Sequence, residues 1–305
     1  AGDYIRVLDC RRHDVYALTA DSAAAMVGRV SFVLGLRGAS LSVDTACSAS
    51  LVAQHVAIRT LQYGESSACL VGGVSMMFKC SSGIGIAMAG MTSPGGRCHT
   101  FDNRADGYAR SEACGVVMLN ATEDIRESLL LTLGSAVMQD GKSASLTAPN
   151  GSAQQALLAG AFADAAQSPQ NMSLYEAHGT GTSLGDPIEI GSITSTTIDP
   201  NRLTPLMCCG VKASIGHAEP AAGMCGLLQL VASLPVAMAA PNAQLRTMNP
   251  HVESSIRGGN CAPMTLRAQS LAKKFVGGAS SFGFAGTIAH AIMCRGEDSN
   301  AVSNV

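Results

Sequence analysis

The sequence is poor in charged residues. Only 14% of its 305 residues are Asp, Glu, Lys or Arg, against roughly 25% in an average soluble protein, whereas 47% are apolar. The formal net charge of −2 gives no basic surface of the kind that binds nucleic acid or an anionic membrane. We therefore expect a compact protein with a large core, and neither nucleic acid nor a membrane as its partner.

The chain also lacks the cysteine spacings of a disulfide framework or a zinc site. Its cysteines number 11, an odd count, and they are scattered without any C-x-x-C pair. This pattern favours a reducing compartment. We expect the cytoplasm, with a plastid as the alternative, and no bound metal.

Charge is missing altogether from residues 220–244. This length would allow a membrane span of about 20 residues, but Gln229, Ser233, Pro235 and several Ala and Gly residues interrupt it. We predict a buried helix in this stretch rather than a membrane span.

No internal repeat, low-complexity tract or linker divides the chain, so we treat residues 1–305 as a single unit. Short apolar runs alternate with helical spacings, and this alternation is typical of layered α/β folds. The expected strands are residues 40–43, 68–74, 115–119, 129–137, 173–177, 206–211, 275–279 and 287–293. The expected helices are residues 51–61, 152–166 and 221–234.

Cys47, in the stretch "SVDTACSAS", lies between an expected strand and an expected helix. A helix N-terminus lowers the pKa of a cysteine thiol from about 8.5 toward neutrality, which favours the nucleophilic thiolate. The small neighbours of Cys47 leave room for a substrate. A buried structural cysteine explains the same stretch equally well.

Two histidines occur in similar surroundings, each just after an expected strand and next to glycine. They are His178 in "YEAHGTGTSLGDPIE" and His217 in "VKASIGHAEPAAG". At the carboxyl end of a strand an imidazole can donate to a carbonyl oxygen or move a proton, although a core histidine fits either position. Lys212 and Glu219 flank His217, where they either orient the imidazole and neutralise each other or form a simple ion pair.

Two other glycine-containing stretches do not match the nucleotide-binding and serine-hydrolase motifs that they resemble. "GTGTSLG" follows an expected strand, but its glycines do not fit G-x-G-x-x-G and no acidic residue follows at the required distance. "SSFGFAG" does not fit the G-x-S-x-G turn of serine hydrolases. Neither a dinucleotide site nor a serine nucleophile is supported.

Four ordered motifs, "VDTACSAS", "EAHGTGTSLGDPIE", "VKASIGHAEPAAG" and "SSFGFAGT", resemble the ketosynthase domains of modular type I polyketide synthases and the related fatty-acid β-ketoacyl synthases. The resemblance covers nearly the whole chain. It implies a thiolase-like α-β-α-β-α sandwich of two similar halves, which we place at residues 1–120 and 121–305, and a homodimer.

The resemblance implies an acyltransferase that extends a chain by decarboxylative Claisen condensation. Cys47 would accept an acyl group from the phosphopantetheine thioester of an acyl carrier protein, and a malonyl-type thioester would then lose carbon dioxide and attack it. His178 and His217 would donate to the resulting enolate oxygen. The protein itself would bind no cofactor, because the carrier protein supplies the phosphopantetheine.

Further residues receive roles from the same resemblance. The backbone N–H groups of Cys47 and Phe284 would form an oxyanion hole, with Phe284 as a gate. Thr180 and Thr182 would contact the pantetheine arm. Lys212 and Glu219 would hold the His217 loop.

The sequence departs from the family at two places. Ala285 and Ile288 stand where the family motif "GFGGTNAH" has Gly and Asn, so we expect a crowded turn and a lost polar group there. The family's opening strands and helices have no counterpart before Ala1, so we expect a fragment of a longer protein. The alternative function is a non-catalytic partner subunit like a chain-length factor, although the Cys-His-His set favours an elongating enzyme.

Overall fold

The computed structural model describes residue 19 and residues 22–122, 128–197, 202, 204–257, 261–263, 269–271 and 276–296. Its helices are α3 (Ala23–Leu34), α4 (Ala49–Gln62), α5 (Cys80–Met88), α6 (Gly151–Asp164), α7 (Gly185–Thr197), α8 (Lys212–Ile215), α9 (Ala222–Ser233) and α10 (Pro250–Ile256), with 3-10 turns η2 (Pro169–Asn171) and η3 (Glu219–Ala221). Its strands are β1 (Ala68–Ser75), β2 (Ala113–Asn120), β3 (Leu131–Gln139), β4 (Met172–Glu176), β5 (Leu206–Cys209), β6 (Met238–Ala239), β7 (Cys261–Pro263), β8 (Gln269–Ser270), β9 (Val276–Phe282) and β10 (Thr287–Cys294).

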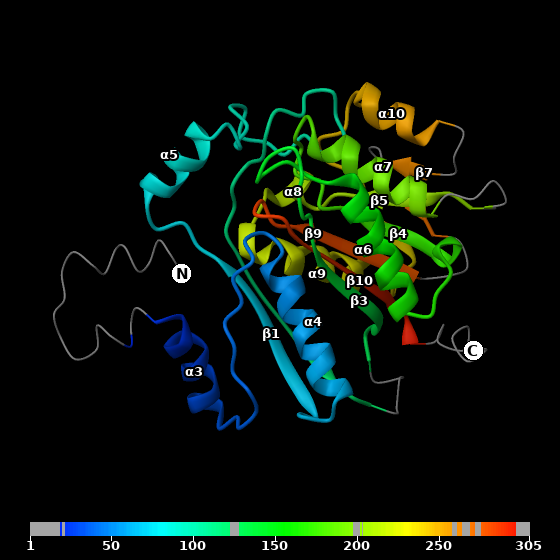
Figure 1. The fold of residues 1–305 in the computed structure, drawn as a ribbon. Helices are drawn as coiled ribbons and strands as arrows, with labels where there is room; N and C mark the ends of the chain where they lie inside the picture. Colours follow the sequence, from blue (N-terminus) through cyan, green and yellow to red (C-terminus); the bar gives the residue numbers. More distant parts are fainter. Residues whose placement is uncertain are drawn as a thin grey trace.

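The largest sheet has six strands in the order β3-β10-β9-β4-β5-β7 (Figure 1). β3, β10 and β9 are antiparallel neighbours, whereas β9, β4, β5 and β7 run parallel. β4 and β5 are short and completely buried, as expected for parallel strands covered on both faces. The carboxyl ends of β4 and β5 lead directly into the segments that carry His178 and His217.

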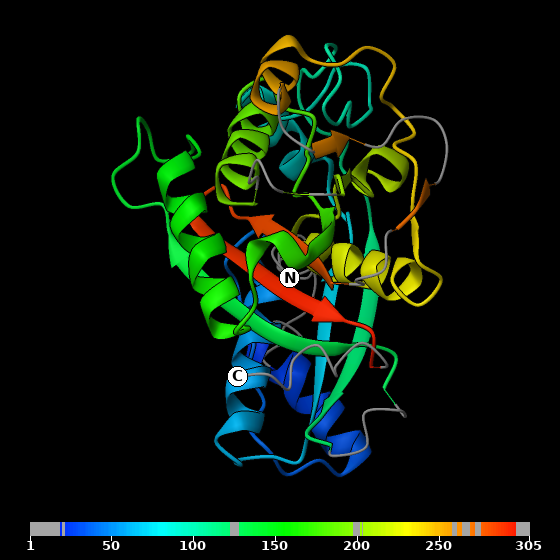
Figure 2. The same cartoon turned by 90° about the vertical axis from the view of Figure 1, so that its right-hand side faces the viewer.

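Helices cover both faces of this sheet (Figure 2). α6 packs on β3 and β10, and α7 packs on α6. On the other face, α4 and α9 lie between the six-stranded sheet and the antiparallel pair β1–β2, because both helices contact strands of each. The described part therefore has a β-α-β-α order of layers.

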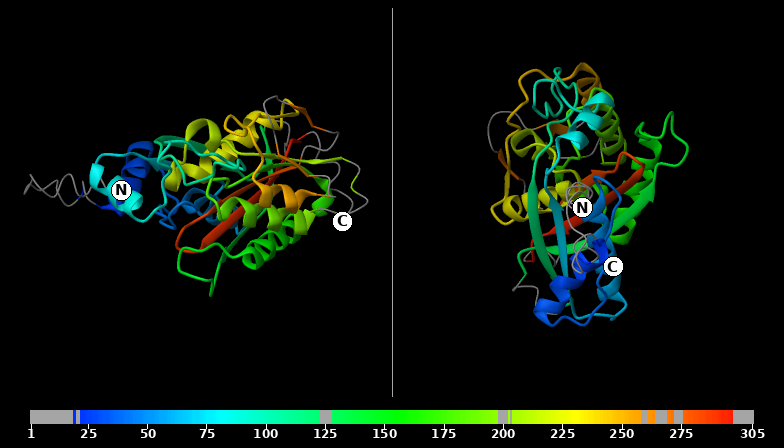
Figure 3. Two further views of the ribbon diagram at one scale, coloured as in Figure 1. Left: turned by 90° about the horizontal axis from the view of Figure 1, so that it is seen from above. Right: turned by 90° about the vertical axis from the view of Figure 1, so that its left-hand side faces the viewer.

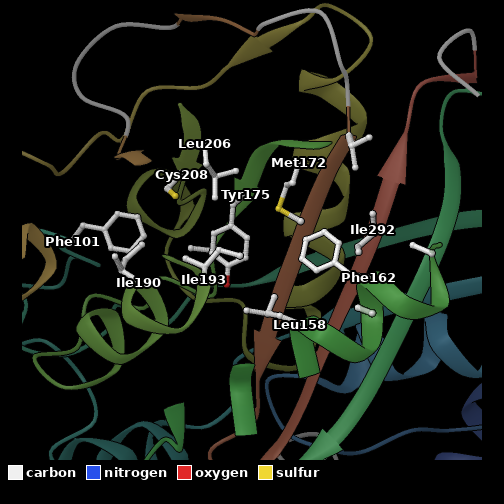
Figure 4. Packing of buried hydrophobic residues seen from close by; sticks show 14 of the residues in the cluster. Phe101, Leu158, Phe162, Met172, Tyr175, Ile190, Ile193, Leu206, Cys208 and Ile292 are labelled. Atoms are coloured by element: carbon white, nitrogen blue, oxygen red, sulfur yellow. The ribbon is translucent and has the colours of Figure 1, made fainter. Parts of the chain in front are cut away.

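Two hydrophobic clusters fill the spaces between these layers. One cluster lies between the six-stranded sheet and α6 and α7, and Tyr175 of β4 is completely buried in its centre (Figure 4). The other surrounds α4 and α9 and includes Leu51, Leu227 and Leu230. α9 is a buried helix, as predicted for the uncharged stretch, and no helix in the described ranges is long and apolar enough to cross a membrane.

α4 and α9 approach each other closely at Gly223. A Cβ at this position would lie 2.7 Å from Leu51 Cγ and 2.9 Å from Ser50 Oγ. Ser50 Oγ also accepts a hydrogen bond of 2.9 Å from the Met224 N–H. Glycine at position 223 therefore allows the helix that follows Cys47 to pack directly against the helix that follows His217.

One face of the β1–β2 pair is apolar and exposed. Leu70, Val74, Val116 and Met118 alternate along the two strands and are 46%, 48%, 57% and 64% exposed. α3 and α5 lie at the same end of the molecule, away from the six-stranded sheet (Figure 3), and neither contains a buried residue. Within the described ranges, nothing buries this face.

All but one of the expected segments coincide with an observed element to within a few residues, whereas the sequence patterns did not predict α3, α5, α7, α8 and α10 or the short strands β6, β7 and β8. The expected segment without a counterpart is the strand at residues 40–43, since residues 39–44 form no regular structure and the residues nearest Cys47 show only an isolated bridge between Thr45 and Cys47. A β-prone run becomes a strand only beside another strand, and none of the described strands pairs with residues 40–43. Cys47 therefore follows a turn rather than a strand.

Candidate active site

Cys47 is buried in a tight turn immediately before α4. Ala46 has a φ of 54°, in the left-handed region that residues with a side chain seldom adopt. The Ala49 N–H closes the turn by donating to the Ala46 carbonyl at 3.0 Å. Ser281 Oγ of β9 donates to the Cys47 carbonyl at 2.7 Å, so the backbone of Cys47 is held from both α4 and the six-stranded sheet.

Burial raises the pKa of the Cys47 thiol to about 11. The Lys212 ammonium and the backbone N–H groups of Phe284 and Cys47 oppose this rise by favouring the thiolate. The prediction that the helix N-terminus brings this pKa toward neutrality is therefore wrong for the resting protein, because the loss of hydration is the larger effect. The resting thiol is neutral, and it needs an acceptor for its proton.

His217 provides that acceptor. Its Nε2 lies 3.1 Å from Cys47 Sγ, although the two residues are 170 positions apart in the sequence. Burial, and then the Lys212 charge, hold the pKa of His217 well below its ordinary value, so the imidazole is neutral. His217 Nδ1 is buried and has no hydrogen-bond partner among the described residues, so no contact within them fixes which ring nitrogen carries the proton.

His178 faces the same centre from the segment after β4. Its ring lies perpendicular to that of His217, at 87°, with 5.5 Å between the ring centroids. The Phe282 N–H donates to His178 Nδ1 at 3.2 Å, so the neutral ring carries its proton on Nε2. Burial, followed by the Lys212 charge and the nearby His217 ring, keeps the pKa of His178 well below its ordinary value.

Two buried acids on the first turns of α7 hold the His178 segment in place. Glu189 accepts hydrogen bonds from the His178 and Gly179 N–H groups at 2.7 and 2.8 Å. Asp186 accepts from the Gly181 N–H at 3.1 Å and from the Phe101 N–H at 2.8 Å. These two acids received no role from the sequence, although acids three positions apart after a glycine-rich loop are a detectable signal.

Thr180 and Thr182 lie next to each other, as the motif suggested. Thr180 is buried and Thr182 is half-buried, and their hydroxyl oxygens are 3.4 Å apart. Thr182 Oγ1 accepts a hydrogen bond of 3.1 Å from the Gly185 N–H, so this hydroxyl also caps the start of α7.

Lys212 and Glu219 do not pair with each other among the described side chains. Glu219 binds Arg110 through both carboxylate oxygens, at 2.6 and 3.0 Å. Lys212 is buried in α8, where it acts electrostatically on Cys47 and on the buried Glu176. Burial raises the pKa of Glu176 to about 7, against the opposing effects of the Val211 N–H and Lys212.

The segment after β9 brings Phe284 toward Cys47. Phe284 is 52% exposed, and its backbone N–H opposes the rise in the pKa of the Cys47 thiol. Ala285 is exposed and has no positive φ, so its methyl group does not crowd the turn; the residue with a φ of 92° is Gly286. Ile288 is completely buried in β10 opposite Phe282, the residue that donates to His178.

Tyr108 is a further residue at this centre that sequence reasoning missed. Its ring meets the His217 ring edge to face, with 4.8 Å between the centroids and 83° between the planes. No local pattern marks Tyr108, which reaches His217 only through the three-dimensional fold. Among the residues whose placement is described, no three His, Cys, Asp or Glu side chains come together as a candidate metal site.

The chain that forms this site belongs to the β-ketoacyl synthase family. The family model for the beta-ketoacyl synthase N-terminal domain matches residues 2–124, and that for the C-terminal domain matches residues 130–246. Over 294 residues the chain is 38% identical to one of the proteins that make up the phenolphthiocerol/phthiocerol polyketide synthase of Mycobacterium tuberculosis, covering 95% of this chain and 13% of that protein.

Solved structures agree with this assignment. The ketosynthase from module 6 of the bacillaene synthase of Bacillus subtilis 168 superposes with a TM-score of 0.85 and 30% identity, covering 93% of this chain and 52% of that one. The oxazolomycin ketosynthase domain of Streptomyces albus JA3453 superposes with a TM-score of 0.83 and 30% identity, covering 90% and 50%. The predicted thiolase-like fold is confirmed, and the chain spans about half the length of these ketosynthases.

Proposed function

We propose that this chain is an elongating ketosynthase that condenses an acyl group held on Cys47 with a malonyl-type thioester. The observation that carries the proposal is the arrangement of Cys47 Sγ 3.1 Å from His217 Nε2, with His178 facing His217. The non-catalytic alternative gains no support from this geometry, because a partner subunit has no use for a buried thiol beside two neutral imidazoles.

The first step is acyl transfer. His217 Nε2 takes the proton of the Cys47 thiol, and the sulfur attacks the carbonyl carbon of the acyl thioester. The N–H groups of Cys47 and Phe284, both of which favour the thiolate in the resting protein, would donate to the oxygen as it becomes negative. The pantetheine thiolate leaves with the proton from His217, and the acyl group remains on Cys47.

The second step is decarboxylation of the malonyl-type thioester. Loss of carbon dioxide leaves an electron pair that is delocalised onto the thioester oxygen. His178 donates to this oxygen from Nε2, and His217 donates from Nε2 once it carries the proton there. Neutral imidazoles suit this task, because each can supply an N–H where negative charge develops, and the contact with the Phe282 N–H already fixes that of His178 on Nε2.

Carbon–carbon bond formation completes the reaction. The enolate carbon attacks the Cys47 thioester, the new oxyanion collapses, and the carbon–sulfur bond breaks to release the β-ketoacyl thioester. The departing Cys47 thiolate takes up one proton, which balances the loss of the malonyl carboxylate as carbon dioxide. The high pKa of the buried thiol favours this reprotonation.

Partners and context form part of the same proposal. We propose that Thr180 and Thr182 contact the pantetheine arm of an acyl carrier protein and that Phe284 lies at the entrance to the active site. Lys212 and Glu219 would support the His217 segment. The two similar halves would comprise residues 1–120 and 121–305. A helix followed by an antiparallel strand pair in each half supports this division: α4 with β1–β2, and α9 with β9–β10. We also propose a homodimer that itself binds no cofactor.

We propose a cytoplasmic location. The relatives described above come from bacteria, which have no plastids, so they do not support the plastid alternative.

Mass spectrometry of Cys47 tests the proposed function. After incubation with an acyl pantetheine thioester, the peptide containing Cys47 should gain the acyl mass. Cys47→Ala should lose acyl transfer and condensation but keep part of the malonyl decarboxylation, because both histidines remain. His178→Ala should show the reverse, with alkylation of Cys47 intact and decarboxylation about 100-fold lower.

Three outcomes would contradict the proposal. These are full condensation by Cys47→Ala, acylation at another residue only, and normal decarboxylation by both His178→Ala and His217→Ala. Absence of acylation in a folded wild-type protein would favour the non-catalytic alternative.

A further inference from the structure

His217 lies in a strand-like contact with residues 109–111. The His217 N–H donates to the Ala109 carbonyl at 2.7 Å, and the Ser111 N–H donates to the His217 carbonyl at 2.9 Å. Gly216, with a φ of 80°, permits this approach, since a Cβ there would lie 3.0 Å from Ser111 Cβ. The backbone of His217 is therefore fixed to the two neighbours of Arg110.

The Arg110 side chain makes a second connection between the same two segments. Its Nε and one terminal nitrogen donate to the two carboxylate oxygens of Glu219, at 2.6 and 3.0 Å. The two side chains are only 14% and 19% exposed, so water competes little for these hydrogen bonds. A planar guanidinium matches a carboxylate in this two-point geometry, which an ammonium group cannot reproduce.

Glu219 needs such a partner. Its φ of 45° places a non-glycine residue in the left-handed region, at the point where the chain turns from His217 into α9. Strain of this kind persists only where surrounding contacts hold the residue in place. Among the described contacts of the Glu219 side chain, the ion pair with Arg110 is the one that does so.

We propose that Arg110 is a positioning residue for the condensation: by holding both carboxylate oxygens of Glu219, it keeps His217 Nε2 at the distance from Cys47 and the enolate that the chemistry requires. This inference rests on the proposed function of His217. The alternative is that the Arg110–Glu219 pair stabilises the fold without affecting the reaction.

Decarboxylation kinetics of Arg110→Met and Arg110→Lys separate these roles. Misplacing a catalytic group by about 1 Å costs up to about 100-fold in rate, so we expect Arg110→Met to lower kcat by about 10- to 100-fold with little change in KM. Arg110→Lys should recover part of the loss, because it restores the charge but not the two-point contact.

The matched control is Arg59→Met. Arg59 forms an ion pair of 2.7 Å with Asp164, and the two side chains are 31% and 25% exposed. Arg59 lies in the last turn of α4, at the opposite end of this helix from Cys47. We expect this variant to lose comparable thermal stability but to keep its kcat.

Each result has a distinct meaning. Equal kcat values for Arg110→Met and Arg59→Met at similar melting temperatures would overturn the positioning role, as would an Arg110→Lys variant no better than Arg110→Met. His217→Ala identifies which proposal has failed. If His217→Ala decarboxylates normally, the proposed function itself is wrong, whereas loss in His217→Ala with a normal Arg110→Met overturns only the inference about Arg110.

Discussion

At Cys47, opposite electrostatic effects act on one sulfur atom. Burial disfavours the thiolate, while Lys212 and the two nearby N–H groups favour it, and burial is the larger effect. The cysteine is therefore not a permanently ionised nucleophile of the kind found at an open helix N-terminus. In the proposed function, Cys47 reacts after its proton passes to His217, whose Nε2 lies 3.1 Å from the sulfur.

This state of the thiol predicts how Cys47 reacts with a small electrophile. Below a pKa of about 11, the thiolate fraction grows about tenfold per pH unit, so alkylation by iodoacetamide should rise in that proportion between pH 7 and pH 10. Mass spectrometry of the Cys47 peptide measures the rate, the exposed Cys80 reports on the reagent, and the buried Cys208 reports on loss of the fold. A rate that levels off below pH 9 would show that the thiol ionises more readily than its burial indicates.

At the scale of elements, the loop between β4 and α7 owes its shape to acids on the helix that follows it. The Glu189 carboxylate accepts hydrogen bonds from the N–H groups of His178 and Gly179 and from the hydroxyl of Tyr175. Backbone N–H groups in a glycine-rich loop would otherwise lie buried without acceptors, and each such group costs about 1–3 kcal/mol.

Glu189→Gln tests this account. A glutamine offers one oxygen instead of two, so its amide group must face at least one N–H donor. We expect the free energy of unfolding to fall by about 1–3 kcal/mol, measured by urea denaturation. Glu253→Gln is the control, because Glu253 is exposed and, among the described side chains, pairs with Arg257 one helical turn away, a contact worth less than about 0.5 kcal/mol. An equal effect of the two substitutions would contradict the bracing role of Glu189.

Elements with a strong local pattern could be predicted from the sequence. β10 and α9 carry long apolar runs, and both lie close to their predicted bounds. α7 was missed because its Gly, Pro, Ser and Thr residues weaken the helical pattern, and the buried contacts of Glu189 and Ile190 stabilise it instead. The residues of the site followed from the motifs, whereas the partner of Glu219 did not, because Arg110 is 109 positions away in the sequence.

At the scale of the whole molecule, one face of β1–β2 leaves apolar side chains exposed. Leu70, Val74, Val116 and Met118 form a contiguous apolar area on a sheet, and such areas promote association. We expect the 305-residue chain to associate beyond a dimer, as measured by light scattering.

Met118→Lys should reduce this association. Since Met118 is 64% exposed, the substitution should leave the melting temperature nearly unchanged. Leu146→Lys is the control, because Leu146 is 77% exposed in a loop outside the β1–β2 face. A monodisperse dimer of the unchanged chain, or equal effects of the two lysines, would show that this face does not cause association.

The close approach of α4 and α9 at Gly223 has a consequence for how the sequence can change. A side chain at position 223 needs the volume that Leu51 and Ser50 now occupy, and those residues lie within one helical turn of Cys47. A larger residue at 223 is therefore compatible with the Cys47–His217 distance only if a smaller one appears at position 51. In natural variants of this chain, we expect positions 51 and 223 to change together. Substitutions in α4, which follows Cys47, would then be coupled to substitutions in α9, which follows His217.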